Sequence, residues 1–177
     1  MPAFTSLNWQ RLDVCAIVQS YGLAVIEERR RTACHDWLTR HNYQIDTLDC
    51  RPGLNSVIPL LGQLLDWEGQ FGYVLHPDSR NLDALSDGFE FEIPEGGGKV
   101  LELIRPDLAW EEDPQWLCGL LSIARGHSIK RLALGRRFFV LLVVPEDTPI
   151  IGMEIETVRV PGAFWDPCHE IHEFIDS

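Results

Sequence analysis

Lysine and arginine are scarce in this sequence: they number 15, against 27 aspartates and glutamates, so the formal net charge of the 177 residues is −12. Binding to phosphate groups needs clustered basic side chains, so the composition argues against nucleic acid and against an anionic membrane surface as the main partner. An acidic protein of this kind is expected to bind a basic partner instead.

Long apolar runs are also missing. The longest run, residues 138–145, has the length of a strand and falls far short of the ~18 residues that a membrane-spanning helix needs. Residues 1–8 contain neither the basic nor the apolar region of a secretory signal, which favours a cytoplasmic protein.

The five cysteines are widely spaced, odd in number and never arranged as C-x-x-C. This pattern predicts neither a disulfide framework nor a zinc knuckle. In a reducing compartment such cysteines are expected to fill the hydrophobic core as small apolar side chains.

The order of apolar patterns predicts an α/β fold with a small parallel sheet flanked by helices. Residues 43–48, 99–104 and 137–144 have strand patterns, and the last of these is apolar on both faces, as in a covered parallel sheet. Two helices are expected to pack on the sheet, at residues 54–67 and 116–124, the latter ending near Gly126.

The length predicts a single domain with two additions to its core. Residues 43–147 form the expected core, residues 1–42 a helical and strand extension, and residues 148–177 a strand and tail. The extension should contain helices at 6–21 and 29–41 and a strand at 23–26. An edge strand is expected at 153–160.

Catalytic motifs are weak. The glycine-rich residues 94–99 follow a helix, precede a strand and lack the Ser or Thr of a P-loop, so they read as a loop. Cys168, His169 and His172 leave open a small metal-dependent hydrolase, although the two histidines are three residues apart rather than four. We expect no catalytic residue, no cofactor and no metal.

The acidic charge is concentrated in residues 78–113, where eleven acidic and three basic residues give a net charge of −8. Residues 78–89 read as a helix, on which Asp83 and Asp87 are four residues apart and face the same way. A solvated helix face is one explanation. The other is a pair of carboxylates that mimics phosphates in the cationic pocket of a nuclease.

Residues 81–87, N-L-D-A-L-S-D, resemble the N-L-D-A-L-x-D segment of the barstar-like family. Members of this family are intracellular ribonuclease inhibitors and toxin immunity proteins. The resemblance extends in order over the strands and helices expected between residues 43 and 144, more than half of the chain. It implies a barstar-like fold and a helix that, with the loop before it, enters the active site of a ribonuclease. By residue match it implies that Asp83 and Asp87 contact the enzyme.

The sequence therefore predicts a cytoplasmic immunity protein whose partner is a cognate toxin, a basic nuclease effector domain. One alternative is a barstar-like binding module that regulates another basic partner, such as a DNA-processing enzyme. The expected partner-binding residues are Asp83, Asp87, Arg80, Asp78, Ser86, Glu90, Tyr73, Glu111 and Glu112.

Overall fold

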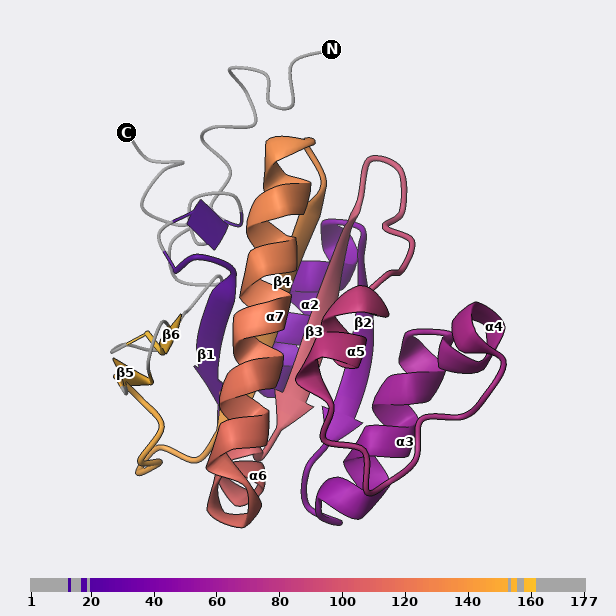
Figure 1. Cartoon of the computed structure of the whole chain (residues 1–177). Coiled ribbons are helices and arrows are strands. Elements are labelled where there is room, and N and C mark those ends of the chain that lie inside the picture. The colour runs from indigo at the N-terminus through magenta and orange to yellow at the C-terminus, as the bar shows by residue number, and fades with distance from the viewer. Residues whose placement is uncertain (1–12, 14–16, 19, 153, 156–157, 162–177) are drawn as a thin grey trace, which may run out of the picture.

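The protein is an α/β structure built on a four-stranded parallel sheet, as seen in a computed structural model (Figure 1). The structure describes residues 13, 17, 18, 20–152, 154, 155 and 158–161. Its main elements are β1 (Leu23–Glu27), α2 (Arg31–Arg40), β2 (Tyr43–Asp49), α3 (Leu54–Leu64), α4 (Trp67–Phe71), α5 (Leu82–Asp87), β3 (Gly98–Ile104), α6 (Pro106–Glu112), α7 (Pro114–Ala133) and β4 (Arg137–Val144).

The strands lie in the order β1-β4-β3-β2, and every neighbouring pair is parallel. The three expected core strands are confirmed as β2, β3 and β4. The extension before residue 43 supplies the fourth strand, β1, which pairs with β4. All eight residues of β4 are buried, because the strand lies inside the sheet and is covered on both faces.

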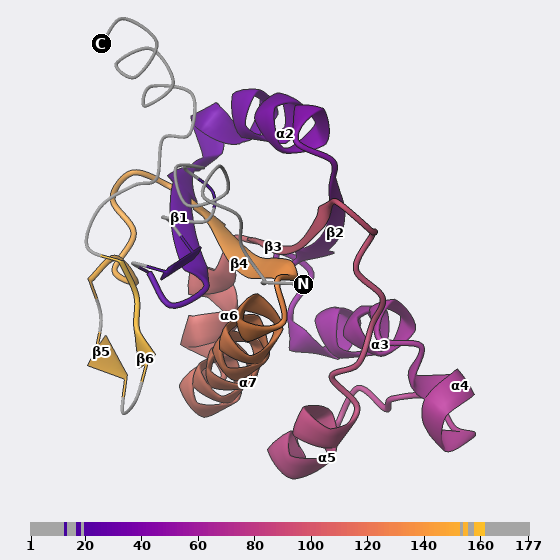
Figure 2. The ribbon, with the colours of Figure 1, turned by 90° about the horizontal axis from the view of Figure 1, so that it is seen from above.

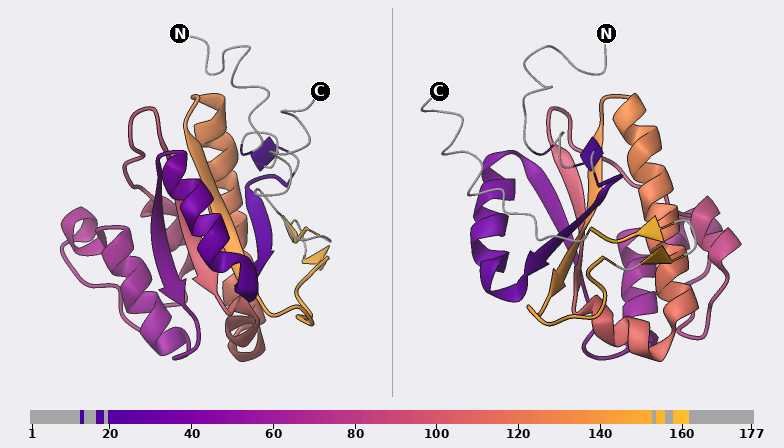
Figure 3. Two further views of the ribbon diagram at one scale, coloured as in Figure 1. Left: turned by 180° about the vertical axis from the view of Figure 1, so that it is seen from behind. Right: turned by 90° about the vertical axis from the view of Figure 1, so that its left-hand side faces the viewer.

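Helices cover the two faces of the sheet unequally. Between β1 and β2 the chain crosses one face of the sheet through α2. The helices that follow β2 and β3, among them α3, α5 and α7, lie on the other face (Figures 1 and 2). The left view of Figure 3 shows α2 lying across its face of the sheet. The apolar core is accordingly divided into two clusters, one under α3 and α7 and one under α2.

Two helices differ from their predicted lengths on the side of the sheet that carries α5. The helix expected at 54–67 is broken after α3, because Asp66 has a left-handed backbone (φ 51°) and α4 begins after it. The helix expected at 78–89 is only α5, which starts after Asn81. The Asn81 side chain accepts hydrogen bonds from the amides of Asp83 and Ala84, each 3.1 Å long, and so fixes this start.

Two further expectations were wrong in their bounds. Helix α7 runs through Gly126 to Ala133. The tertiary contacts of its last two turns outweigh the weak helix preference of a single glycine. The strand expected at 153–160 is instead two short strands, β5 (Glu154–Ile155) and β6 (Val158–Arg159), which pair with each other and not with the main sheet. Most of the helix expected at 6–21 lies outside the described residues.

Candidate functional site

Helix α5 presents its acidic residues to solvent and its apolar residues to α7. Asp83, Ser86 and Asp87 are exposed, whereas Leu85 is buried. Within the described part of the chain, the carboxylates of Asp83 and Asp87 form no hydrogen bond or ion pair with another side chain. Two charges without a side-chain partner among the described residues are therefore held on one face of a capped helix.

The position of α5 depends on a glycine of α7. A Cβ atom at Gly119 would lie only 2.3 Å from a methyl group of Leu82, the first residue of α5. The missing side chain therefore lets Leu82 pack directly on the α7 backbone. Leu82 belongs to the apolar residues that pack against the core on this face of the sheet.

An aromatic cluster adjoins the end of α5. Trp67, on α4, is buried, and its ring centroid lies 4.6 Å from that of Phe71 and 6.2 Å from that of Tyr73. Phe71 and Tyr73 are 41% and 54% exposed. A Cβ atom at Gly88 would lie 2.5 Å from the Trp67 ring and 2.8 Å from the Phe71 ring, so both rings contact the residue that follows α5.

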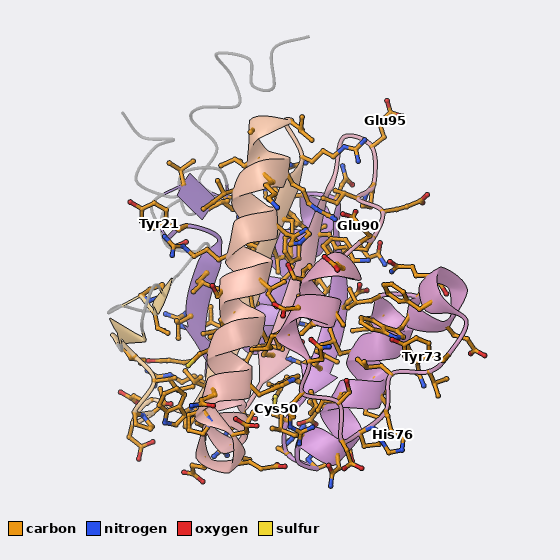
Figure 4. All side chains as sticks on the ribbon, viewed as in Figure 1. Tyr21, Cys50, Tyr73, His76, Glu90 and Glu95 are labelled. Atoms are coloured by element: carbon orange, nitrogen blue, oxygen red, sulfur yellow. The ribbon has the colours of Figure 1, made fainter. Side chains whose placement is uncertain are left out.

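We refer to the exposed polar residues of α5 and the exposed rings of the aromatic cluster at its end together as the acidic–aromatic surface. Figure 4 shows Tyr73 on the side of the molecule that carries α3, α4 and α5. Exposed aromatic rings beside exposed carboxylates suit a partner that offers basic side chains, because a cation is attracted both by the charge and by the face of a ring. The surface consists of Phe71, Tyr73, Asp83, Ser86 and Asp87.

The loop before α5 holds two of the predicted site residues. Arg80 lies 3.4 Å from the carboxylate of Asp113 and donates a 2.5 Å hydrogen bond to the carbonyl of Pro77. Its charge therefore fixes the loop against the start of α7. Asp78 is exposed and lies 3.5 Å from the ring of His76, which points away from the body of the molecule in Figure 4.

Three other predicted site residues lie outside the acidic–aromatic surface. Glu90 lies past the end of α5 and forms a 3.2 Å ion pair with Arg131 of α7. Glu112, on α6, accepts a 2.9 Å hydrogen bond from the amide of Leu54 and so stabilises the start of α3. Glu111 is exposed on the same short helix α6.

The acidic stretch at residues 78–113 does not form one surface. Glu102 is fully buried in β3, on the face of the sheet that α2 covers. Asp107 is buried and receives hydrogen bonds of 2.7–3.0 Å from Arg105. The negative charge of the stretch is thus divided between structural contacts, the exposed carboxylates of α5 and other exposed acidic residues such as Glu92 and Glu95.

Glu102 is the centre of the best-developed polar cluster among the described residues. Arg31 and His35 reach its carboxylate from α2, at 2.8–2.9 Å and 2.7 Å, and Thr47 donates a 2.8 Å hydrogen bond from β2. Burial alone raises the pKa of Glu102, but these hydrogen bonds outweigh it and hold the pKa below its ordinary value. The cluster binds α2 to the sheet.

Nucleophiles and metal ligands are poorly placed in the described residues. Burial raises the pKa of the Cys50 thiol to about 12, so this cysteine stays protonated and unreactive. No group of three or more His, Cys, Asp or Glu side chains is arranged to hold a metal ion among the residues that the structure describes. Cys168, His169 and His172 lie outside these residues.

Two buried basic residues of α7 were missed by the sequence interpretation. His127 and Arg131 lie beneath the segment that follows α5, and Arg131 stacks 3.8 Å from the ring of Phe91. Both residues lie on α7 beyond Gly126, and the contacts of Arg131 with residues 89–91, about 40 positions away in the sequence, leave no local signal. Ending the helix at that glycine hid their place in the site.

Comparison with protein-family models, with curated proteins and with solved structures finds no match for this chain. The likeness to the barstar-like family therefore remains a resemblance of sequence. None of the helices within the described residues is long and apolar enough to cross a membrane.

Proposed function

We propose that this protein is an immunity protein that binds a basic, toxic nuclease in the cytoplasm and blocks its active site. The observation that carries the proposal is the pair Asp83 and Asp87, two exposed carboxylates without a structural partner in the described chain, on a helix that Asn81 caps. A pair of exposed charges without a side-chain partner in the described residues is explained by a binding partner.

The proposed inhibition is by occlusion. A nuclease holds the phosphates of its substrate with clustered cations, and two carboxylates on one helix face offer those cations matching charges. Phe71 and Tyr73 add apolar area beside the carboxylates, as is typical of the energetic centre of a protein interface.

The net charge of −12 supports rapid capture of such a partner. Electrostatic steering raises association rates to ~10⁸–10⁹ M⁻¹s⁻¹ at low salt, from ~10⁵–10⁶ M⁻¹s⁻¹ for neutral surfaces. An inhibitor that protects its own cell requires this speed, since free toxin acts on its host.

A second candidate is a binding module that regulates another basic partner, such as a DNA-processing enzyme. The exposed Asp78, just before the acidic helix, adds negative charge that suits any basic partner, whether or not that partner is a nuclease. Unlike a toxin, such a partner would not damage the cell when it is not bound.

Survival of bacteria tests the proposal. The chain is co-expressed with a panel of inducible basic ribonucleases and deoxyribonucleases, and growth is scored. We expect rescue from at least one nuclease, and loss of rescue in the Asp83→Ala/Asp87→Ala double variant.

The matched control removes the same charge elsewhere. Asp36 is exposed on α2, on the opposite face of the sheet, and Glu95 is exposed in the loop before β3. The Asp36→Ala/Glu95→Ala variant is expected to rescue growth like the wild type. Equal rescue by both double variants would contradict the proposed site, and rescue from none of the nucleases would contradict the proposed function.

A further inference from the structure

The chain at and after the end of α5 is fixed by hydrogen bonds from side chains, since it forms no strand or further helix. Residues 86–91, which we call the exit segment, include the end of α5 and an irregular stretch beyond it. Its carbonyl groups are satisfied from two helices. Gln70 of α4 donates to the carbonyl of Gly88 at 3.1 Å, and Arg131 of α7 donates to those of Phe89 and Phe91.

Arg131 is the main fixed charge beneath the exit segment. It is 8% exposed, donates to the carbonyls of Phe91 at 3.2 Å and Phe89 at 3.4 Å, and forms its ion pair with Glu90. Its guanidinium also lies 3.8 Å from the centre of the Phe91 ring. One buried side chain thus binds three consecutive residues of the exit segment.

His127 lies one turn before Arg131 on the same face of α7. It is 9% exposed, its ring centroid is 5.0 Å from that of Phe89, and its ring adjoins the backbone of Ser86. The charged groups that face it are Arg131 and Lys130 on α7 and Glu90 on the exit segment.

The surroundings of His127 favour its neutral form. Burial lowers its pKa most, and the positive charges of Arg131 and Lys130 lower it further, against smaller opposing effects of Glu90 and the Ser86 backbone. When the ring gains a proton at acid pH, a second positive charge is created beside Arg131 in a buried site. The cost of that charge is avoided if the exit segment moves away and admits water.

We propose that His127 and Arg131 are positioning residues for the acidic helix, and that protonation of His127 releases the exit segment, making the acidic–aromatic surface sensitive to acid. Ser86, Gly88 and Phe89 connect the carboxylates of α5 to these anchors, so release of the segment disturbs the placement of Asp87. The consequence for a partner, weaker binding in acid, rests on the proposed function. The release itself is a property of the free protein.

The test therefore uses the free, full-length protein. Amide hydrogen exchange and the His127 ring resonances are followed by NMR from pH 8 to pH 5, with exchange rates corrected for their intrinsic pH dependence. The amides of Leu85 and Gly88, which donate within α5 to Asn81 and Ala84, report on the helix. An amide of the buried strand β4, such as that of Leu141, is the internal control.

We expect the protection of the α5 amides to fall as the His127 ring titrates, by about tenfold for each unit by which its pKa lies below the ordinary value. The control amide of β4 should not change. Because the ring and the amides are observed together in the wild type, the comparison needs no variant. Titration of His127 without any loss of protection in α5 would overturn the proposal.

Two variants separate positioning from simple stability. His127→Gln keeps a polar side chain beside Ser86 but cannot gain a proton, so the protection of α5 should become independent of pH. Arg131→Lys keeps the charge but loses the planar fork, so protection should be reduced at every pH. If His127→Gln keeps the pH dependence of the wild type, the inference fails, whatever the survival assay shows about a nuclease.

Discussion

The guanidinium of Arg31 donates two hydrogen bonds, 2.9 and 2.8 Å long, to the carboxylate of Glu102, which is completely buried in the middle of β3. Arg31 is the first residue of α2, the helix that covers one face of the sheet. An ion pair between residues 71 positions apart thus fastens the extension before residue 43 to the core strands.

Removing Arg31 should destabilise the protein strongly. Arg31→Met leaves the buried Glu102 carboxylate without its main partner, and we expect a loss of about 3–5 kcal/mol in the free energy of unfolding. Urea denaturation measures this loss. Arg40→Met, at an exposed position on the same helix, is the control and should change stability by no more than about 0.5 kcal/mol.

The dependence of folding stability on pH should also reveal the contribution of the Glu102 carboxylate. Its pKa is lower in the folded protein than its ordinary value of 4.5, so its charge stabilises the fold above that value. This contribution is lost as the pH falls through the lowered folded pKa. The difference in unfolding free energy between the wild type and Glu102→Gln should stay constant above about pH 5 and shrink below about pH 4.5. Denaturant melts at pH 7, 5 and 3.5 measure it, and an undiminished difference at pH 3.5 would refute the assignment.

Gly119 and Gly126 of α7 provide a matched pair of alanine substitutions. A Cβ atom at Gly126 meets open space, so Gly126→Ala should stabilise the helix by up to about 1 kcal/mol. A Cβ atom at Gly119 meets the Leu82 side chain, so Gly119→Ala must shift this side chain from its packing on α7. We expect thermal melts to show a smaller gain or a loss for Gly119→Ala, and amide exchange in α5 to accelerate in this variant alone. Unchanged exchange in α5 would contradict the close packing.

The sequence predicted the parallel sheet because its strands carry a local signal. The run at residues 138–144 is apolar at every position, which only a strand covered on both faces requires, and β4 is such a strand. The predicted helix at residues 78–89 was too long because Asn81 competes for the backbone as a cap, and the cap fixes the start of α5.

The candidate site was only partly predictable. The spacing of Asp83 and Asp87 showed that they share a face, since that depends on helix period alone. The burial of Glu102, away from the other acidic residues, could not be predicted from the neighbouring sequence. Its partners Arg31 and His35 are brought to it by the crossover through α2. The same limit applies to Arg131, whose partners at residues 89–91 are about 40 positions away.

The kinetics of binding to a basic nuclease identified by the survival assay test the central claim most directly. Surface plasmon resonance would compare the wild type with Asp83→Ala, Asp87→Ala and the Asp36→Ala/Glu95→Ala control, alongside a thermal melt of each. Truncation of either α5 aspartate should cost about 2 kcal/mol or more in binding, roughly 30-fold in affinity, mainly through faster dissociation and with an unchanged melting temperature. The control should bind with an unchanged dissociation rate. Wild-type dissociation rates for both aspartate variants, or unfolding of both, would contradict the assignment of α5 as the inhibitory helix.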